Sequence, residues 1–334
     1  MIGRRFFLEL KYSRPWHFGH ACLGHLRRLL PTVRRTWPGN DPCGSSNDHA
    51  VYAHYDGEGV IHDYVVEQLR QLAIAGFRVT FVTNARRMSD ETISLVRPYC
   101  REMIWRRGVG YDFGAYKDGI AALGDLAACD RLLLMNDSIY GPLVPLREVL
   151  NAANPAACDF WGITDSWDRH YHVQTYFVLF FKRVLTSPVF AKFWHRLPYV
   201  NSKSWVIRYG EVKLSQKLTR QRLNAAVLCP YWEVADKVLA RLESKPRSEM
   251  TAAHKAFIDH LHSNLQFGHP MNSTHYFWDA LIADFRAPFI KRELIRLNPQ
   301  GIVHAWRWPE LIAHHGDYDV NLIRRHLQAD EAIG

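Results

Sequence analysis

The residues best suited to chemistry follow the most apolar strand-like run of the chain. Asn136, Asp137 and Ser138 come directly after Leu132–Met135. A carboxylate at the end of a buried strand, beside amide and hydroxyl oxygens, suits Mg²⁺ or Mn²⁺ held jointly with a diphosphate, because such ions take one or two carboxylates plus phosphate oxygens. The ion would stabilise a departing diphosphate. The alternative is an Asx turn that leaves the strand and binds nothing.

A second candidate segment is GYDFGAYKD, residues 110–118. Gly110 would let a ligand approach the backbone closely. Asp112 and Tyr116 supply polar and aromatic groups, and Lys117 together with a helix N-terminus favours a diphosphate. In the alternative interpretation, Asp112 only caps the following helix and the glycines only form the loop.

Six further residues suggest roles for polar groups beside a sugar. Glu211 could take a proton from an attacking hydroxyl, or could be a first-turn acid that stabilises its helix by about 0.3–1 kcal/mol. Asp165 and Asp168 compete with it as base. His172 and Gln174 open the next strand and could hold sugar hydroxyls. Lys291, in the apolar context Phe289-Ile290, could reach a phosphate or the acceptor, or be a surface lysine with a buried stem.

The elements that must position these residues alternate between strand and helix. We expect strands at about 51–55, 78–83, 102–106 and 131–135, and helices at 60–76, 89–96 and 112–123, from apolar spacing and from stop signals such as Gly76 and Pro98. Alternation of this kind predicts parallel βαβ units. Ligands bind at the carboxyl ends of such strands, where Tyr55, Asp56 and Asn84 also lie.

From Cys158 the pattern changes. Residues 159–164 and 173–181 are too close for a crossover helix, so we expect them to be antiparallel additions to the sheet. Helices are predicted at 187–197 and 211–223, and a helical region over 244–334. The predicted division is a basic N-terminal segment and linker (1–47), a catalytic domain (48–243) and a helical, acceptor-side C-terminal region (244–334).

The charge is concentrated at the N-terminus. Residues 1–36 carry eight Arg or Lys and one acid, a net +7 of the formal +9, interleaved with Phe, Trp and Leu. Such a segment suits an anionic membrane surface or a solvated helix packed on the core. No nucleic-acid motif accompanies it. Residues 37–47 (WPGNDPCGSSN) predict a linker. Six scattered cysteines and no apolar run of about 20 residues predict a cytoplasmic protein that at most attaches peripherally to a membrane.

Several segments together resemble a known family, the rhamnan synthesis F family. They are GYDFGAYKDG (110–119), LLLMNDSIYGPL (132–143), DFWGIT (159–164), HVQTYF (172–177), NSTHYFW (272–278) and PFIKRELIRLNP (288–299). The resemblance covers about residues 51–310. It implies a GT-A-like glycosyltransferase that uses dTDP- or GDP-rhamnose to extend O-antigen or capsule chains on a lipid-linked acceptor. Asn136–Ser138 would stand in the place of the DxD motif, with one acid where that motif has two.

We assign a role to each of the candidates. The donor would meet Tyr55, Asp56, Asn84, Gly110, Asp112, Tyr116, Lys117, Asn136, Asp137, Ser138 and Gln174, with the cation on Asp137. Glu211 or Asp165 would activate the acceptor, held by His172 and Lys291. Two alternatives remain: a non-catalytic glycan- or nucleotide-sugar-binding subunit of a synthesis complex, and a phosphosugar transferase.

Overall fold

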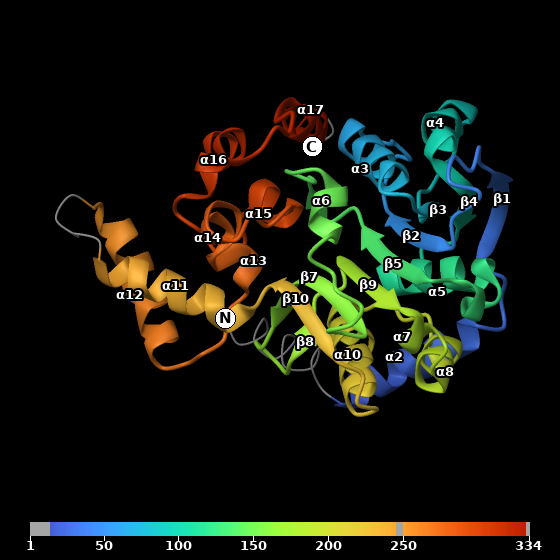
Figure 1. The fold of residues 1–334 in the computed structure, drawn as a ribbon, viewed down its shortest axis with the longest axis horizontal. Helices are drawn as coiled ribbons and strands as arrows, with labels where there is room; N and C mark the ends of the chain where they lie inside the picture. Colours follow the sequence, from blue (N-terminus) through green and yellow to red (C-terminus); the bar gives the residue numbers. More distant parts are fainter. Residues whose placement is uncertain (1–13, 245–249, 332–334) are drawn as a thin grey trace.

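The computed structural model describes residues 14–244 and 250–331. Its centre is a large twisted sheet with helices on both faces (Figure 1). The strand order is β1-β4-β3-β2-β5-β9-β7-β10, and β8 pairs with β7. The strands are β1 (Val33–Pro38), β2 (Asp48–His54), β3 (Arg78–Thr83), β4 (Cys100–Arg106), β5 (Arg131–Asn136), β7 (Phe160–Ser166), β8 (His172–Val173), β9 (Phe177–Phe181) and β10 (Ala225–Cys229).

Parallel pairing joins β4, β3, β2 and β5 at the centre of the sheet. Alternate residues of β2 bury on opposite faces: Ala50 and Tyr52 belong to one hydrophobic cluster, and Val51 and Ala53 to the other. Burial on both faces explains why these strands are continuous apolar runs. The predicted strands and helices of this region are confirmed, including the Ser89 side chain that accepts from Thr92 N at the start of α4.

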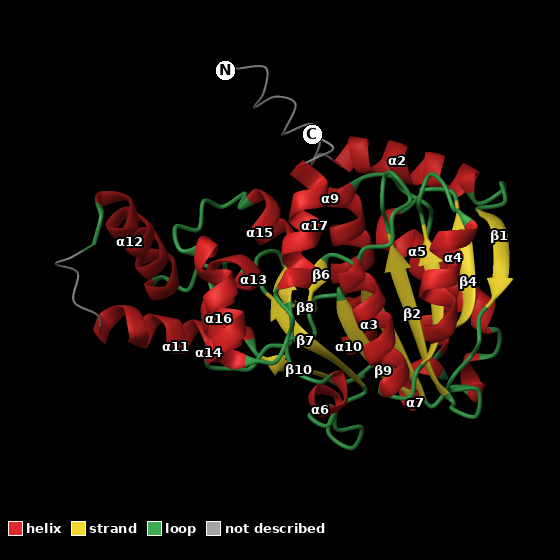
Figure 2. Ribbon diagram, turned by 90° about the horizontal axis from the view of Figure 1, so that it is seen from above, coloured by secondary structure: helices red, strands yellow, loops and turns green. Residues whose placement is uncertain are grey.

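The helices form two layers around the sheet (Figure 2). The first cluster includes residues of α3 (Asp63–Ile74), α4 (Asp90–Val96), α6 (Leu146–Leu150), α11 (Tyr231–Ser244), α12 (Ala252–Gln266), α14 (Trp278–Ala283), α15 (Arg292–Leu297), α16 (Trp308–His315) and α17 (Asn321–Glu331). The second includes α5 (Tyr111–Leu123), α7 (Lys182–Leu185), α8 (Pro188–Arg196), α9 (Lys203–Trp205) and α10 (Val212–Thr219). One face therefore carries most of the C-terminal region.

Beyond β5 the direction of the strands changes. Strand β9 is antiparallel to both β5 and β7. Strand β7 therefore runs in the same direction as β5, and the predicted antiparallel addition holds for β9 but not for the direction of β7. Strand β10, which the sequence did not predict, pairs in parallel with β7 at the edge. The predicted fold class, a mostly parallel sheet with antiparallel additions and a helical C-terminal region, is confirmed.

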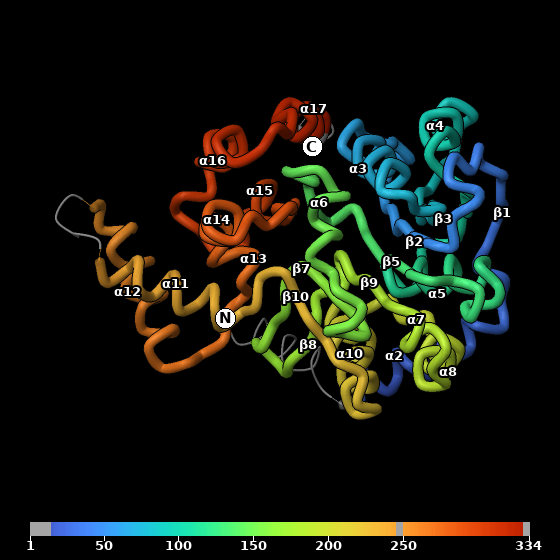
Figure 3. The backbone as a smooth tube through the Cα atoms, viewed as in Figure 1, coloured from blue at the N-terminus to red at the C-terminus, as the bar shows by residue number. Residues whose placement is uncertain are grey.

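A second, two-stranded sheet ties the C-terminal region to the end of β5. Strand β6 (Ile139–Tyr140) follows Asn136–Ser138 and pairs antiparallel with β11 (Ile290–Lys291), with Lys291 opposite Ile139. The chain trace in Figure 3 shows how the C-terminal segments run along one side of the sheet and end at α17. There α17 contacts α3. The β6–β11 pairing brings residues about 150 positions apart in the sequence to the end of β5.

Residues 14–47 are part of the fold, and β1 takes up the start of the linker predicted over 37–47. Strand β1 contains Trp37 and Pro38 and pairs with β4 at the edge of the sheet. Asp41 also forms an ion pair with Arg78. Helix α2 (Arg14–Arg27) packs through His17 and Gly24. Residues 1–13 of the predicted basic segment, 245–249 and 332–334 lie outside the described residues, and the predicted division into domains stays a prediction.

Candidate active site

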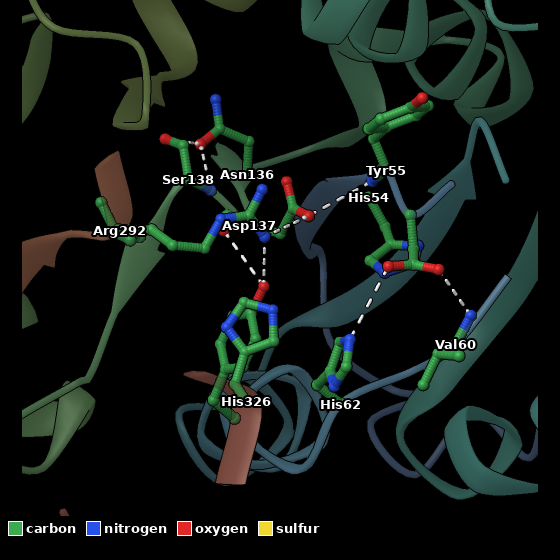
Figure 4. Close-up of polar contacts among 12 residues, drawn as sticks. His54, Tyr55, Val60, His62, Asn136, Asp137, Ser138, Arg292 and His326 are labelled. Carbon is green, nitrogen blue, oxygen red and sulfur yellow. Dashed lines mark hydrogen bonds and ion pairs between the residues drawn. The ribbon is translucent and has the colours of Figure 1, made fainter. Parts of the chain in front are cut away.

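The end of β5 presents its polar residues on two sides. Successive side chains of a strand point in opposite directions. Ser138 N and Oγ donate to Asn136 Oδ1, at 3.1 and 2.5 Å, so these two side chains lie together. Asp137 has different partners: Tyr55 N donates to its Oδ2 at 3.3 Å and Arg292 Nη1 at 3.1 Å. Figure 4 shows Asp137 between Tyr55 and Arg292, with Asn136 and Ser138 apart from them.

On the Asn136 side, three elements bring polar groups together. Asn136 Nδ2 donates to Asp112 Oδ2 at 3.0 Å, which joins β5 to the first turn of α5. Lys291, from β11, donates from Nζ to Ser138 Oγ at 3.3 Å and lies 4.0 Å from the centroid of the Tyr176 ring. The sequence predicted four of these residues as site residues, and the structure places them in contact.

Glu211 approaches the same region from the helices that cover the second cluster. Its Oε1 accepts from Thr175 N and Oγ1 at 2.6 and 2.9 Å, and its Oε2 lies 3.7 Å from His172 Nε2. Glu211 does not begin a helix: it ends the π-helical turn η3 (Val206–Glu211) between α9 and α10. The predicted first-turn dipole role is therefore wrong, since the carboxylate lies mid-helix. Single π-helical turns of this kind are frequent at functional sites.

The charges of Asp112, Glu211 and Lys291 act on one another. Burial raises the pKa of Asp112 to about 6, and the nearby Glu211 carboxylate adds to the effect. Burial lowers the pKa of Lys291 to about 8, against the attraction of Glu211 and Asp112. Burial thus shifts the pKa of the Asp112 carboxyl and of the Lys291 ammonium, and the charge of Glu211 acts on both. Such perturbation is typical of catalytic and binding sites.

The contacts of Asp137 do not fit a cation site. Arg292 forms an ion pair with this carboxylate and donates a hydrogen bond to the Tyr64 hydroxyl at 2.5 Å. Burial by itself would lower the pKa of Arg292, but the charge of Asp137 raises it. Asn136 and Ser138, on the other side, are neutral. Across residues 14–244 and 250–331, no three His, Cys, Asp or Glu are grouped so that they could hold a metal ion. The expectation of Mg²⁺ or Mn²⁺ on Asp137 has no support in this geometry.

Tyr55 and Asp56 follow β2 beside Asp137. Tyr55 is 52% exposed, so its ring is open to a ligand. Asp56 Oδ1 accepts from Glu58 N and Val60 N at 2.9 and 2.8 Å, which shapes the loop. Burial opposes ionisation of Asp56, but hydrogen bonds from His62 and the loop backbone outweigh it and lower the pKa. Asp56 is therefore a carboxylate that orders the loop under Tyr55.

Four predicted donor-site residues have structural partners instead. Asn84 Oδ1 accepts from the buried Arg106 at 2.6 Å. The Tyr116 ring is fully buried and its hydroxyl donates to Thr175 O at 2.9 Å. The Lys117 ammonium binds the carbonyl oxygens of His195 and Leu197 at the end of α8. Gly110, at φ 84°, donates to Asn201 Oδ1 at 2.6 Å. The structure does not bring the side chains of Asn84 and Lys117 to the Asn136 side. Tyr116 does lie there, beside Asn136 and Asp112, although its hydroxyl is bound to Thr175 O.

The two other predicted acids are also held by the fold. Asp165 accepts from Tyr231 N at 2.7 Å and from Trp167 Nε1 at 3.2 Å. Asp168 accepts from Ser166 Oγ at 2.8 Å. Gln174 Oε1 accepts from Thr164 Oγ1 at 2.6 Å. Of the two candidate bases, Glu211 is the one whose charge acts on Asp112 and Lys291.

Sequence reasoning missed Arg292, Thr175 and Tyr176 as residues of this region. Thr175 and Tyr176 lie in HVQTYF, and Arg292 follows Lys291 in PFIKREL, two of the segments that carried the family resemblance. That these segments meet at the end of β5 depends on the β6–β11 pairing, which the sequence did not predict.

Comparison with known proteins gives one family. The model of "Rhamnan synthesis protein F" matches residues 79–332. An uncharacterized protein y4gN of Sinorhizobium fredii is 30% identical over 51% of this chain, which spans 45% of that relative's length. The virulence protein VirA of Vibrio anguillarum is 27% identical over 68% of this chain and 74% of its own.

Solved structures with similarity include a putative nucleotide-diphospho-sugar transferase from Desulfovibrio desulfuricans. It is 15% identical, has a TM-score of 0.31, and the match covers 67% of this chain and 98% of that one. The galactosyltransferase LgtC in complex with donor and acceptor sugar analogs is 12% identical, with a TM-score of 0.33, over 80% of this chain and 97% of that one. The family match covers well over half of the chain, so the chain belongs to the rhamnan synthesis protein F family.

Proposed function

We propose that this chain transfers a sugar, rhamnose, from dTDP- or GDP-rhamnose to a growing lipid-linked surface polysaccharide such as O-antigen or capsule. The observation that carries the proposal is the cluster at the carboxyl end of β5. There Asp112, Asn136, Ser138 and Lys291 are linked by hydrogen bonds, and the charge of Glu211 acts on Asp112 and Lys291. Family membership supports the polysaccharide as product.

Each residue of the cluster then has a role that its contacts support. Tyr55 lies at the exposed end of β2 for the nucleotide. Asn136, Ser138 and Lys291 meet the diphosphate, and Asp112 accepts hydrogen bonds from sugar hydroxyls. Glu211 takes the proton of the acceptor hydroxyl as the new glycosidic bond forms and the bond to the diphosphate breaks. Thr175 holds the Glu211 carboxylate, and His172 lies beside it.

We place the reaction at the inner face of the cytoplasmic membrane, where a lipid-linked acceptor would be. Helix α2 and the residues after it expose large apolar side chains, among them Phe18, Leu26 and Leu29 at 73, 61 and 80%. Arg27 ends this helix, and Arg34 and Arg35 lie on the exposed strand β1 that follows. The helix packs on the segment that leads to Glu211: the His17 ring lies 5.5 Å from that of Tyr209. Within the described residues, no helix is long and apolar enough to cross a membrane.

A non-catalytic sugar-nucleotide-binding subunit is the second candidate. The neutral residues on either side of Asp137 favour it, because a site built around a metal needs acids there. The Glu211 carboxylate, which Thr175 holds through one oxygen, favours the enzyme, because a general base must be oriented. A phosphosugar transferase, the third alternative, would release a nucleoside monophosphate.

A thermal-shift screen of the full chain against sugar nucleotides tests the proposal. We expect dTDP- or GDP-rhamnose to raise the melting temperature, since a ligand at about 100 times its Kd adds about 2.7 kcal/mol of stability. Sugar nucleotides that leave the melting temperature unchanged, across the dTDP, GDP and UDP series, would contradict a donor site.

A further inference from the structure

We propose that the Lys291 ammonium, and not a divalent cation, is the counter-charge for the diphosphate of the donor, so that this chain binds nucleotides without metal. This inference rests on the proposed function and names what holds the donor. It starts from the disagreement between the expected cation and the contacts at the end of β5.

The side chains of Asn136, Asp137 and Ser138 lie on two sides of the strand end, so the carboxylate is separated from the amide and the hydroxyl. The only carboxylate of the three residues faces Tyr55 and Arg292, where a guanidinium already neutralises it. On the other side Asn136 and Ser138 present an amide and a hydroxyl. The two carboxylates there already accept hydrogen bonds, Asp112 from Asn136 Nδ2 and Phe113 N and Glu211 from Thr175. Neutral oxygens alone are weak ligands for Mg²⁺, which is held in proteins through carboxylates and phosphates. A cation on this side therefore has to come from elsewhere.

Lys291 supplies that cation from a fixed position. The register of the small sheet sets Lys291 opposite Ile139, directly after Ser138. Its Nζ donates to Ser138 Oγ and lies over the Tyr176 ring, so the side chain is restrained at both partners. An ammonium is a compact point charge with three donors and binds phosphate well in this role.

The surrounding charges explain why the ammonium is needed. Glu211, Asp112 and Glu293 act on Lys291 as carboxylates, and Lys203 acts as a further cation. A diphosphate that enters beside Glu211 and Asp112 meets two acids of its own sign. Lys203 is 65% exposed and paired with Glu293 at 3.3 Å, so solvent screens it. The half-buried Lys291 is screened less.

Arg292 positions Lys291. It begins α15, directly after β11, and binds Asp137 and the Tyr64 hydroxyl. Its backbone N–H donates to Ser138 O at 3.0 Å. These contacts attach the start of α15 to the end of β5 on the opposite side from the Lys291 ammonium. Asp137 therefore helps to position Lys291 indirectly, through its ion pair with Arg292.

Calorimetric titration of the full chain with dTDP and GDP tests the inference. We expect one of these two nucleotides to bind more tightly than the other. For that nucleotide, the Kd in excess EDTA should agree within about twofold with the Kd in excess Mg²⁺ or Mn²⁺. Lys291→Met should weaken binding about tenfold or more, because a charge-assisted hydrogen bond is lost. Lys291→Arg keeps the charge and should retain most of the affinity. Lys203→Met, in the same neighbourhood, is the matched control and should bind like the wild type.

Two results would overturn the inference: binding that disappears in EDTA and returns with Mg²⁺ or Mn²⁺, or wild-type affinity in folded Lys291→Met. Circular dichroism establishes that the variants fold, and the EDTA comparison on the wild type decides even if Lys291→Met does not. Metal-dependent binding would leave the proposed function standing. Failure of both nucleotides to bind under every condition would remove the proposed function together with the inference.

Discussion

At the scale of single residues, the choice of base depends on which carboxylate has an oxygen directed at the site. Both oxygens of Asp165 accept hydrogen bonds from the fold, from Tyr231 N and Trp167 Nε1. Glu211 is held by Thr175 through one oxygen, while the other lies 3.7 Å from His172. A base must be oriented and must also reach the proton that it takes. Glu211 satisfies both conditions.

We expect Glu211→Gln to lower sugar transfer by about 10²–10⁴-fold, the usual contribution of a general base. Nucleoside diphosphate binding should be at least as tight as in the wild type, because the amide keeps its size, can still accept from Thr175 and removes a charge of the same sign as the diphosphate. Asp165→Asn is the comparison: it disturbs a buried hydrogen-bond pair and should lower the melting temperature while the folded protein remains active. Transfer assays with both variants check this, and full activity in Glu211→Gln would exclude Glu211 as the base.

The raised pKa of Asp112 predicts a pH-dependent stability. The folded protein, in which this pKa is about 6 instead of 3.8, holds the proton more tightly than the unfolded chain. The resulting stabilisation is fully present below about pH 4 and is lost as the pH rises through about 6. Relative to Asp112→Asn, the free energy of unfolding of the wild type should fall by about 1–3 kcal/mol between pH 4 and pH 7. Urea unfolding measures it, and parallel pH curves for the two proteins would contradict the assignment.

At the scale of elements, a buried arginine organises the loop from β4 to α5. Arg106 is fully buried and donates to Asp118 at 2.5 Å, to Asn84 at 2.6 Å and to Val109 O at 2.9 Å. The loop it braces ends at Gly110, and α5 then carries Asp112. Arg106 therefore sets the start of the helix on which the site depends.

We expect Arg106→Met to destabilise the protein by about 3–5 kcal/mol, because Asp118 would be left buried without its cation. Arg107→Met, at the next position, is the control, since Arg107 is exposed and its loss should change stability by less than about 0.5 kcal/mol. Denaturant unfolding of the two variants gives both values. Equal stabilities would mean that the buried ion pair does not brace the loop.

Elements with strong periodicity could be predicted from the sequence, and pairings between distant segments could not. Strands β2 to β5 are apolar runs followed by stop signals, so their order along the chain was evident. Strand β1 carries Arg34 and Arg35 on an exposed edge and did not resemble a strand. Strand β11 has two residues. Asp112, Asn136 and Ser138 followed from strand ends, whereas Arg292 depended on the β6–β11 pairing.

At the scale of the whole molecule, the α2 surface and the site share an element. Helix α2 packs on residues 198–209, which lead into the turn that carries Glu211. A membrane bound to α2 would thus lie near the acceptor side of the site. Removal of residues 1–47 would also remove β1 from the sheet, so substitutions test the membrane role more cleanly than truncation.

We expect Phe18→Ser combined with Leu26→Ser to reduce binding to anionic liposomes by about tenfold or more, since burying each side chain contributes about 1.5–3 kcal/mol. Phe267→Ser combined with Leu297→Ser, at sites with similar exposure of 70 and 69%, should bind like the wild type. Added salt should weaken the electrostatic part. Co-sedimentation measures binding by the wild type and by both double variants, with and without added salt. Equal binding by both double variants would show that α2 is not the membrane surface.

The most direct test of the account is the identity of the nucleotide that the reaction releases. Full-length protein is incubated with dTDP- or GDP-rhamnose and membrane-derived lipid-linked glycan, and the released nucleotide is identified by chromatography. We expect free dTDP or GDP, formed at a rate that Glu211→Gln lowers by about 10²–10⁴-fold. Release of a nucleoside monophosphate, or a bound sugar nucleotide that is never consumed, would contradict the assignment of this chain as a glycosyltransferase.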